Sequence, residues 1–336
     1  MKAMTIGMGE QQRKTGRVGL AVGLAALSAA ASDGAAVTPP ACPSFEVWAA
    51  EHHIPTADDN PASRAAFAAN CERWDSLNTV AGGARWQADG TAHLTPAQFS
   101  ARFGGCYSEE PAVATAPLRT ESGRGVEVPI TVDWRTKGQV TPVKNQGAFG
   151  TCWSFGVAEN LEGLNVRQGH PLTNISEQEF ISCCAKCQGS AADTSFKWLT
   201  NATGGQPALE ESWPYVGKPG ECKDATAPRA PVKLHSWGRV VDDGTGLPVA
   251  SGLVQHGPMG LGVDATCFQG YKEGIIRNCT SKGVDHAVLM VAAGVDSGVS
   301  YFTIKNSWGS KWGEHGYVRL EQGHEWWGPI SAIYTE

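Results

Sequence analysis

A single cysteine stands at the start of a helix-length apolar stretch in "NQGAFGTCWSFGVAENLEGL" (145–164). A thiol becomes a strong nucleophile when it ionises, and both a helix N-terminus and a neighbouring imidazolium lower its pKa. Cys152 is placed to use the helix N-terminus. His286 opens the apolar run "VDHAVLMV" and is the candidate imidazole, although a histidine there is also typical of an ordinary strand end.

A histidine base of this kind needs a third group that fixes the orientation of its ring. Asn306, in "IKNSWGSKWG", offers an amide oxygen for this purpose. Trp308, two residues later, offers an indole that would shield the His–Asn bond from water. These residues together predict nucleophilic catalysis by a thiolate.

The chain has 336 residues, enough for one large or two smaller domains. Its formal net charge of −6 argues against nucleic acid as the main partner. Basic residues precede an apolar stretch at 18–31, which predicts a signal peptide over residues 1–31, too short for a membrane span. An Ala-rich soluble helix is the alternative. We expect the secretory route, ending in a lysosome, a vacuole or outside the cell.

A secretory route implies an oxidising compartment, so most of the ten cysteines are expected in disulfides. Three sequons agree with secretion and make Asn174, Asn201 and Asn278 glycosylation candidates.

The first third of the chain has the spacing of helices. Residues 43–53 and 61–77 are expected as helices, and apolar residues recur at helical intervals in the second. Thr95 precedes "PAQFSARF" (96–103) as an N-cap. Residues 109–127 are rich in Pro, Gly and Thr, which is typical of a linker.

Beyond the linker, helical patterns come first and strand patterns follow. The helices are expected at 152–167, after Ser176, and up to Gly204. Short apolar or alternating runs at 258–266, 285–295, 301–308 and 316–323 predict antiparallel strands. This order indicates an α+β fold of two lobes, with a cleft between them as the expected active site.

Four segments resemble the papain family of cysteine peptidases: "DWRTKGQVTPVKNQGAFGTCWSF", "ISEQEF", "VDHAVLMV" and "IKNSWGSKWGEHGY". The resemblance runs from about Val128 to the end. It implies a helical lobe that carries the nucleophile Cys152 and a β-barrel-like lobe that carries His286, its general base and acid. It also implies that Asn306 orients His286 and that Gln146 joins the Cys152 backbone N–H in an oxyanion hole. It implies an endopeptidase that needs no cofactor or metal.

The resemblance also implies a substrate site. Its backbone is expected at Gly189 and Ser190, where Ser190 replaces the family's second glycine, and Trp308 borders the leaving-group side. An apolar pocket is expected for the residue two positions before the scissile bond, which favours Leu, Phe or Tyr over Arg. The expected pocket residues are Ala191, Ala192, Gly262, Ala287 and, less securely aligned, Ala332; Asp285 is also assigned to the substrate site.

A faded signature of the cathepsin L-like branch lies in the first third, at Asp59, Ser63, Phe67, Asn70, Trp74 and Asn78. It implies an inhibitory propeptide over residues 32–126 before a peptidase domain at 127–336. A generic amphipathic helix is the alternative. The expected product is a monomeric zymogen, whose partners are peptide substrates, its own propeptide and cystatin-type inhibitors.

The cysteines depart from the family pattern, because Phe149 stands where the family has the partner of Cys187. By resemblance Cys183–Cys222 is expected, with Cys267–Cys279 and a tight Cys184–Cys187 link as new pairs. Cys184–Cys222 with Cys183–Cys187 remains an alternative. Phe149 is expected to plug the space of the lost bridge. Cys152 is expected to stay unpaired, and Cys42, Cys71 and Cys106 have no assigned partners.

Two rival functions are considered. A catalytically silent relative would act as a binding or inhibitory protein, but the complete set Gln146, Cys152, His286 and Asn306 argues against it. A metal or redox site in "CCAKC" would need a fourth ligand that no nearby histidine supplies.

Overall fold

The computed structural model describes residues 42–80, 83–107, 130–223, 226–279, 283–323 and 331–336. The predicted signal peptide at 1–31, the linker at 109–127 and the boundary between 126 and 127 lie outside the described residues. Among the described residues, no helix combines the length and the apolar character that a membrane crossing requires.

The first third forms the helices that the sequence predicts: α1 (Phe45–Glu51), α2 (Pro61–Leu77) and α3 (Pro96–Phe103), with a short 3₁₀ turn at Thr56–Asp58. The Asn60 side chain caps α2, and Pro61 begins it. Thr95 and Gln98 form a reciprocal capping box at the start of α3. These caps satisfy backbone N–H groups that would otherwise lack partners.

Three signature positions of α2 face the rest of the protein. Phe67, Asn70 and Trp74 are buried. The Asn70 side-chain amide donates to the carbonyl oxygens of Ala92 and Leu94, each over 2.8 Å. The Trp74 indole donates to the Gln269 carbonyl oxygen over 3.0 Å.

The outer signature positions act locally. Asn78 caps the end of α2 and exchanges hydrogen bonds with the Trp86 backbone. Asp59 pairs with Arg64 at the exposed N-terminal end, and the Ser63 backbone N–H donates to the Asn60 cap. The helix is therefore held to its surroundings mainly by residues 67–78.

The helices of the C-terminal two thirds are α4 (Cys152–Arg167), α5 (Glu177–Cys183), α6 (Ala192–Thr203) and α7 (Leu247–His256). Gly204 ends α6 in the left-handed conformation, with φ of 65°. Helix α7 was not predicted from the sequence; it follows Gly246, whose φ is 76°, and buries Val249, Ala250 and Leu253.

The strands form one eight-stranded sheet and one small two-stranded sheet. The large sheet has the order β3 (Trp237–Val241), β10 (Ser331–Thr335), β4 (Met259–Val263), β7 (His286–Asp296), β8 (Val299–Lys305), β9 (Tyr317–Glu321) and β6 (Ile275–Ile276), and β2 (Val132–Asp133) pairs with β7. Among the strands of the described residues, the β6–β9 pair alone is parallel. The sequence predicted β4, β7, β8 and β9 but not the flanking strands.

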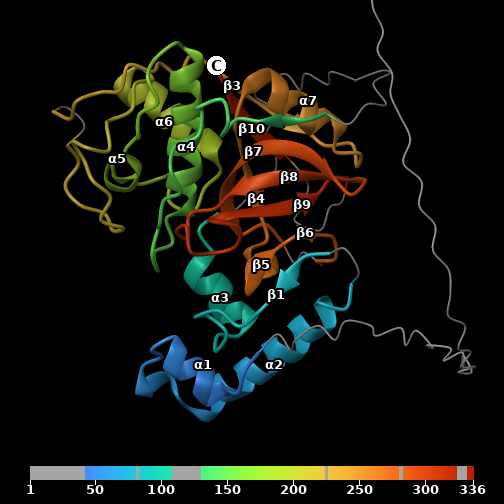
Figure 1. The fold of residues 1–336 in the computed structure, drawn as a ribbon. Coiled ribbons are helices and arrows are strands. Elements are labelled where there is room, and N and C mark those ends of the chain that lie inside the picture. The colour runs from blue at the N-terminus through green and yellow to red at the C-terminus, as the bar shows by residue number, and fades with distance from the viewer. Residues whose placement is uncertain (1–41, 81–82, 108–129, 224–225, 280–282, 324–330) are drawn as a thin grey trace, which may run out of the picture. The chain divides into compact units, whose positions relative to one another are not determined.

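The small sheet joins β1 (Arg85–Trp86) from the first third to β5 (Tyr271–Glu273), which follows a 3₁₀ turn at Ala265–Phe268. One apolar cluster contains Trp48, Phe67 and Trp74 from the first third together with the large sheet. The first third is therefore packed into the same core as the sheet, and Figure 1 shows β1 beside β5.

Helices α4, α5 and α6 gather on one side of the large sheet, as the two-lobe α+β prediction requires (Figure 1). Helix α4 contacts strand β7, and a buried ion pair joins Glu159 of α4 to Lys305 of β8 over 2.8 Å. These contacts fix the N-terminus of α4 relative to the first residue of β7.

Candidate active site

Cys152 is the first residue of α4, and its side chain is fully buried. The backbone N–H of Ala287, in β7, donates to its sulfur over 3.3 Å. The unpaired N–H groups and the dipole of the helix N-terminus favour a negative charge on this sulfur. The predicted position of Cys152 at the start of a helix is therefore confirmed.

His286 begins β7 and is fully buried. Its Nε2 lies 2.8 Å from Oδ1 of Asn306, and the same oxygen accepts the backbone N–H of Ser307 over 2.8 Å. An amide oxygen only accepts, so Nε2 carries the proton and Nδ1 keeps its lone pair in the neutral ring. The Trp308 indole stacks on the imidazole, with 4.9 Å between ring centroids. The sequence-predicted set His286, Asn306 and Trp308 is thus brought together.

Burial lowers the pKa of His286 to about 4, against which the hydrogen bond to Asn306 acts weakly. The charged ring would lose its hydration without gaining an anionic partner. His286 is therefore neutral in this state at ordinary pH.

Gln146 is buried and held by Ser307. Its side-chain oxygen accepts from the Ser307 hydroxyl over 2.6 Å, and its backbone N–H donates to the Ser307 carbonyl over 2.8 Å. The amide nitrogen donates to the Phe149 carbonyl oxygen over 2.9 Å. One of its two amide hydrogens remains for another acceptor.

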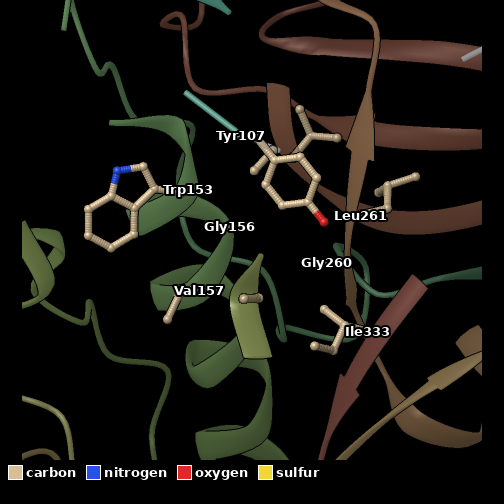
Figure 2. Close-up of a pocket in the computed structure, with 10 residues that line it drawn as sticks. Tyr107, Trp153, Gly156, Val157, Gly260, Leu261 and Ile333 are labelled. Carbon is tan, nitrogen blue, oxygen red and sulfur yellow. The ribbon is translucent and has the colours of Figure 1, made fainter. Parts of the chain in front are cut away.

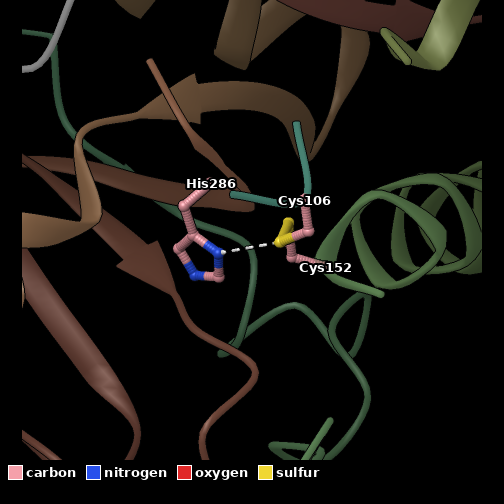
Figure 3. Close-up of side chains that lie close together, drawn as sticks. All are labelled: Cys106, Cys152 and His286. Carbon is pink, nitrogen blue, oxygen red and sulfur yellow. Dashed lines mark hydrogen bonds between the residues drawn. A yellow bond between two sulfur atoms is a disulfide. The ribbon is translucent and has the colours of Figure 1, made fainter. Parts of the chain in front are cut away.

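The expectation that Cys152 stays unpaired is wrong for this structure, because Cys152 is bonded to Cys106. Their Cα atoms lie 5.8 Å apart, a normal separation for a disulfide. Nδ1 of His286 faces Sγ of Cys106 at 3.9 Å (Figure 3). The physical reason is that the other eight cysteines pair among themselves, so Cys152 is the one partner left for Cys106 in the cleft.

The remaining cysteines form Cys42–Cys71, Cys183–Cys222, Cys184–Cys187 and Cys267–Cys279. The last three pairs are the ones that the sequence favours. Phe149 is not the expected plug: its side chain is 44% exposed, and its ring lies over the backbone of Gly217. Because Cys187 is paired with Cys184, it needs no partner at position 149.

Asp285 was assigned to the substrate site, and here it holds the segment that leads to Cys106. Its carboxylate accepts the Ser100 hydroxyl of α3 and, over 2.7 Å, the Ala265 N–H. Its carbonyl oxygen accepts the Cys106 N–H over 3.1 Å. On the same side, the rings of Phe99 and Phe103 contact Trp308, at 5.3 and 5.7 Å between centroids.

The predicted apolar pocket contains Tyr107. Its ring lies between α4, which carries Trp153 and Gly156, and β4, which carries Gly260 and Leu261 (Figure 2). The lining residues are Tyr107, Trp153, Gly156, Val157, Ala192, Gly260, Leu261, Ala287, Val288 and Ile333. Gly262 also faces the Tyr107 ring, because a Cβ added there would collide with it. Among the described residues, no charged side chain lines the pocket.

Two of the expected pocket residues lie elsewhere. Ala332 is buried in the apolar cluster of the sheet, and its neighbour Ile333 lines the pocket instead. Successive residues of a strand point to opposite faces, so a one-residue error of alignment exchanges them. Ala191 is buried at the N-cap of α6 but is absent from the pocket wall.

Gly189 and Ser190 form a turn after the Cys184–Cys187 pair. Gly189 has φ of 69°, whereas φ of Ser190 is not positive. The backbone N–H and the hydroxyl of Ser190 lie 3.0 and 2.8 Å from the Cys187 carbonyl oxygen. A serine therefore fits here without backbone strain.

Among the sequons, Asn174 and Asn201 are exposed and Asn278 is half-buried. Cys106, Cys152 and His286 bring their sulfur and nitrogen atoms within 4.8 Å of one another, but the two sulfurs are joined in a disulfide and so offer a metal no thiolate ligand.

Sequence reasoning missed Cys106 and Tyr107 as occupants of the cleft. The parity of the cysteines was the available signal. Three cysteines precede the linker and seven follow it, so each part contains an odd number. With an odd number on each side, either a disulfide links the two parts or each part keeps an unpaired thiol.

Comparison with known proteins agrees with this geometry. Residues 128–333 match the family described as papain family cysteine protease. A cysteine proteinase of Trypanosoma brucei brucei is 39% identical over 68% of this chain and 52% of its own length. The cysteine endopeptidase Rep1 of Oryza sativa subsp. japonica is 31% identical over 87% of this chain and 81% of its own. This chain spans about half the length of the first trypanosomatid relatives.

Solved structures of proenzymes are also similar. The Amb a 11 cysteine protease of ragweed pollen, in its proform, is 26% identical with a TM-score of 0.72, covering 87% of this chain and 91% of its own. Digestive procathepsin L 3 of Tenebrio molitor is 25% identical with a TM-score of 0.66, covering 86% of this chain and 97% of its own. The chain belongs to the papain family of cysteine proteases.

Proposed function

We propose that residues 127–336 form a cysteine endopeptidase and that residues 32–126 are its inhibitory propeptide. The observation that carries this proposal is the orientation of His286. Asn306 accepts the Nε2 proton over 2.8 Å, which directs Nδ1 toward the Cys106–Cys152 disulfide, 3.9 Å from Sγ of Cys106. This arrangement fits a cysteine nucleophile with a positioned general base.

In the proposed reaction, the freed Cys152 thiolate attacks the carbonyl carbon of a peptide bond. The negative charge that develops on the carbonyl oxygen is stabilised by the Cys152 backbone N–H and the Gln146 amide, which Ser307 holds in place. The protonated His286 then gives its proton to the leaving amine. Water hydrolyses the resulting acyl-enzyme, with His286 as the base.

The occupied cleft supports the propeptide assignment. The segment from Ser100 to Tyr107 contacts Asp285, Trp308 and the apolar pocket, all of which a substrate would need. Relatives with similar structures are proenzymes by their descriptions. We infer that the chain is made as an inactive precursor on the secretory route, as a monomer open to cystatin-type inhibitors after processing.

The apolar pocket sets the proposed specificity. The aromatic ring of Tyr107 itself lies between Leu261 and Gly156. An arginine there would lose hydration without meeting a carboxylate. The proposed substrates therefore carry Leu, Phe or Tyr two positions before the scissile bond.

The test uses the full-length protein, treated with acid and a dithiol, with hydrolysis of a fluorogenic peptide as the readout. Wild-type protein should gain activity, whereas Cys152→Ala and His286→Ala should lose it while keeping the elution volume and circular dichroism of wild type. Near-normal turnover by Cys152→Ala would refute the proposed nucleophile.

A further inference from the structure

We propose that the prosegment inhibits covalently: the Cys106–Cys152 disulfide is a redox lock that a thiol reductant must open before the nucleophile exists. The inference rests on the proposed function, which makes Cys152 the nucleophile. Contacts alone would block the cleft reversibly. A disulfide removes the thiolate itself, because a sulfur bonded to another sulfur cannot ionise.

The chain between α3 and Cys106 is shaped for this bond. Gly105 has φ of 63°, a conformation that favours glycine. A Cβ at Gly104 would lie 2.5 Å from a carboxylate oxygen of Asp285, so the backbone passes close over this residue. The Cys106 N–H then donates to the Asp285 carbonyl oxygen over 3.1 Å. The backbone at Gly104 and Gly105, together with the hydrogen bond to Asp285, therefore places Cys106 beside Cys152.

The remaining cysteines leave no other partner for Cys106. All ten cysteines lie in described residues, and none is free. One pair, Cys42–Cys71, lies before the linker, and three pairs lie after it. One cysteine on each side is left over, and these two meet in the cleft.

The locked site cannot catalyse even if a peptide reaches it. His286 has no thiolate beside it and is kept neutral by burial. Sγ of Cys106 occupies the position that Nδ1 of His286 faces (Figure 3). The base is thus assembled, but the nucleophile is withheld.

The opening reaction is thiol–disulfide exchange with a dithiol. One thiolate of the reductant attacks Sγ of Cys106, the Cys106–Cys152 bond breaks, and its electron pair leaves on Sγ of Cys152. The second thiol of the reductant then attacks the mixed disulfide, which releases Cys106 as a thiol and oxidises the reductant to its cyclic disulfide. Two electrons pass from the dithiol to the protein.

The direction of attack follows from the leaving groups. The N-terminus of α4 stabilises a thiolate on Cys152, and the better-stabilised thiolate leaves faster. Attack at Cys106 therefore frees the nucleophile in the first step. Both cysteine side chains are at most 2% exposed, so exchange is slow until the prosegment loosens.

The lock has a consequence for processing. A cut between Tyr107 and Ile130 separates the two parts of the chain, but the disulfide still joins them. Proteolysis without reduction therefore yields an inactive two-chain product. Reduction and removal of the prosegment are both required for activity.

The experiment uses the full chain secreted from an oxidising host, trapped with an alkylating reagent and mapped by mass spectrometry without reduction. We expect a peptide that contains Cys106 joined to Cys152. A second arm labels Cys152 with a biotin-linked haloacetamide after acid treatment, with and without dithiothreitol. Labelling of wild type should fall at least about 100-fold without reductant, because only the thiolate reacts.

The matched variants are Cys106→Ser, which removes only the lock, and Cys42→Ser/Cys71→Ser, which removes the other prosegment disulfide. Cys106→Ser should label without reductant, and the double variant should behave like wild type. Should Cys106→Ser fail to fold, the disulfide map of wild type still decides.

The inference would be overturned by Cys106 alkylated in the unreduced wild-type map, or by equal labelling of wild type and Cys106→Ser without reductant. Latency relieved by a chelator instead of a dithiol would also overturn it, in favour of a metal held by Cys106, Cys152 and His286. Neither readout needs turnover. A mapped disulfide with no hydrolysis after reduction would refute the proposed function alone, and hydrolysis with a free Cys106 would refute the lock alone.

Discussion

Nε2 of His286 and Oδ1 of Asn306 lie 2.8 Å apart, and the backbone N–H of Ser307 holds the same oxygen from the other side. The ring therefore has one tautomer and one orientation before any substrate arrives. Such preorganisation is what a general base needs. While Cys152 is bonded to Cys106, however, His286 has no thiol from which to accept a proton.

The first prediction concerns pH. Burial lowers the pKa of His286 to about 4, and an exposed histidine has the ordinary value of 6.5. Between these values the unfolded chain binds a proton that the folded precursor refuses. The free energy of unfolding is thus unaffected by His286 above pH 6.5, and it decreases as the pH falls toward 4, because protonation of His286 favours the unfolded chain. The expected loss is about 2 kcal/mol in the free energy of unfolding between pH 7 and pH 5.

Urea unfolding of full-length wild type and His286→Gln at both pH values measures this loss. The variant should lose about 2 kcal/mol less than wild type over the same interval. Burial raises the pKa of neighbouring Asp285, which contributes with the opposite sign in both proteins and cancels in the comparison. Parallel pH dependence of the two proteins would contradict the assignment.

The second prediction concerns the close approach of the Gly104 backbone to the Asp285 carboxylate. Gly104→Ala places a Cβ 2.5 Å from the Asp285 carboxylate, so the prosegment must shift away from the cleft. With dithiol present at neutral pH, the full-length variant should be more active than wild type by about 10-fold, because a loss of about 1.4 kcal/mol in docking has this effect.

Gly90→Ala is the matched control, since its Cβ would meet only His52 at an ordinary 3.6 Å. Initial rates of peptide hydrolysis, measured before any cleavage of the chain, provide the readout. Equal rates for the two glycine variants would argue against the close approach.

The third prediction concerns the buried amide of α2. Asn70→Ala removes both donors to the Ala92 and Leu94 carbonyl oxygens. Leu94 keeps the Gln269 side chain as a donor, over 2.9 Å. The change should lower the free energy of unfolding of the full chain by about 1–3 kcal/mol.

Thr79→Ala, an exposed hydroxyl at the end of the same helix, serves as the control and should change the free energy by less than about 0.5 kcal/mol. Urea titration of both variants checks this. Indistinguishable midpoints would show that the Asn70 hydrogen bonds do not hold the prosegment.

The fourth prediction concerns specificity. Ala192 begins α6 and lines the apolar pocket. Ala192→Glu adds a carboxylate where the helix N-terminus favours one, and it should raise kcat/KM by about 10-fold for peptides with Arg two positions before the scissile bond. Ala192→Gln has the same shape without charge and should not.

Profiling of the activated enzymes with a peptide library measures both changes. A wild-type preference for Arg would refute the pocket, and an equal gain in the Gln variant would show that size, not charge, is responsible.

Much of the site was predictable because its residues lie in long motifs with strong local rules. Cys152 follows from a thiol at a helix start, and His286 and Asn306 follow from strand ends in the order of the family. The helices of the prosegment follow from caps at Asn60 and Thr95. These features depend on local spacing, which a sequence displays directly.

The errors have physical causes of a different kind. Ala332 and Ile333 differ by one strand position, which local sequence does not fix. Helix α7 begins after Gly246 with a proline in its first turn and contains a further glycine, Gly252, so its helical pattern is weak. The Cys106–Cys152 bond joins residues 46 positions apart, and its partners depend on the whole fold.

The final prediction tests the central claim, that Cys152 is the nucleophile of a peptidase. Reduced and processed enzyme is mixed with an activated ester of a Phe-containing peptide, quenched in acid within milliseconds and mapped by mass spectrometry. We predict the acyl group on the peptide that begins α4, bound to Cys152, in an amount that decays as product accumulates. Steady hydrolysis with no acyl group on Cys152 at any time would contradict the account.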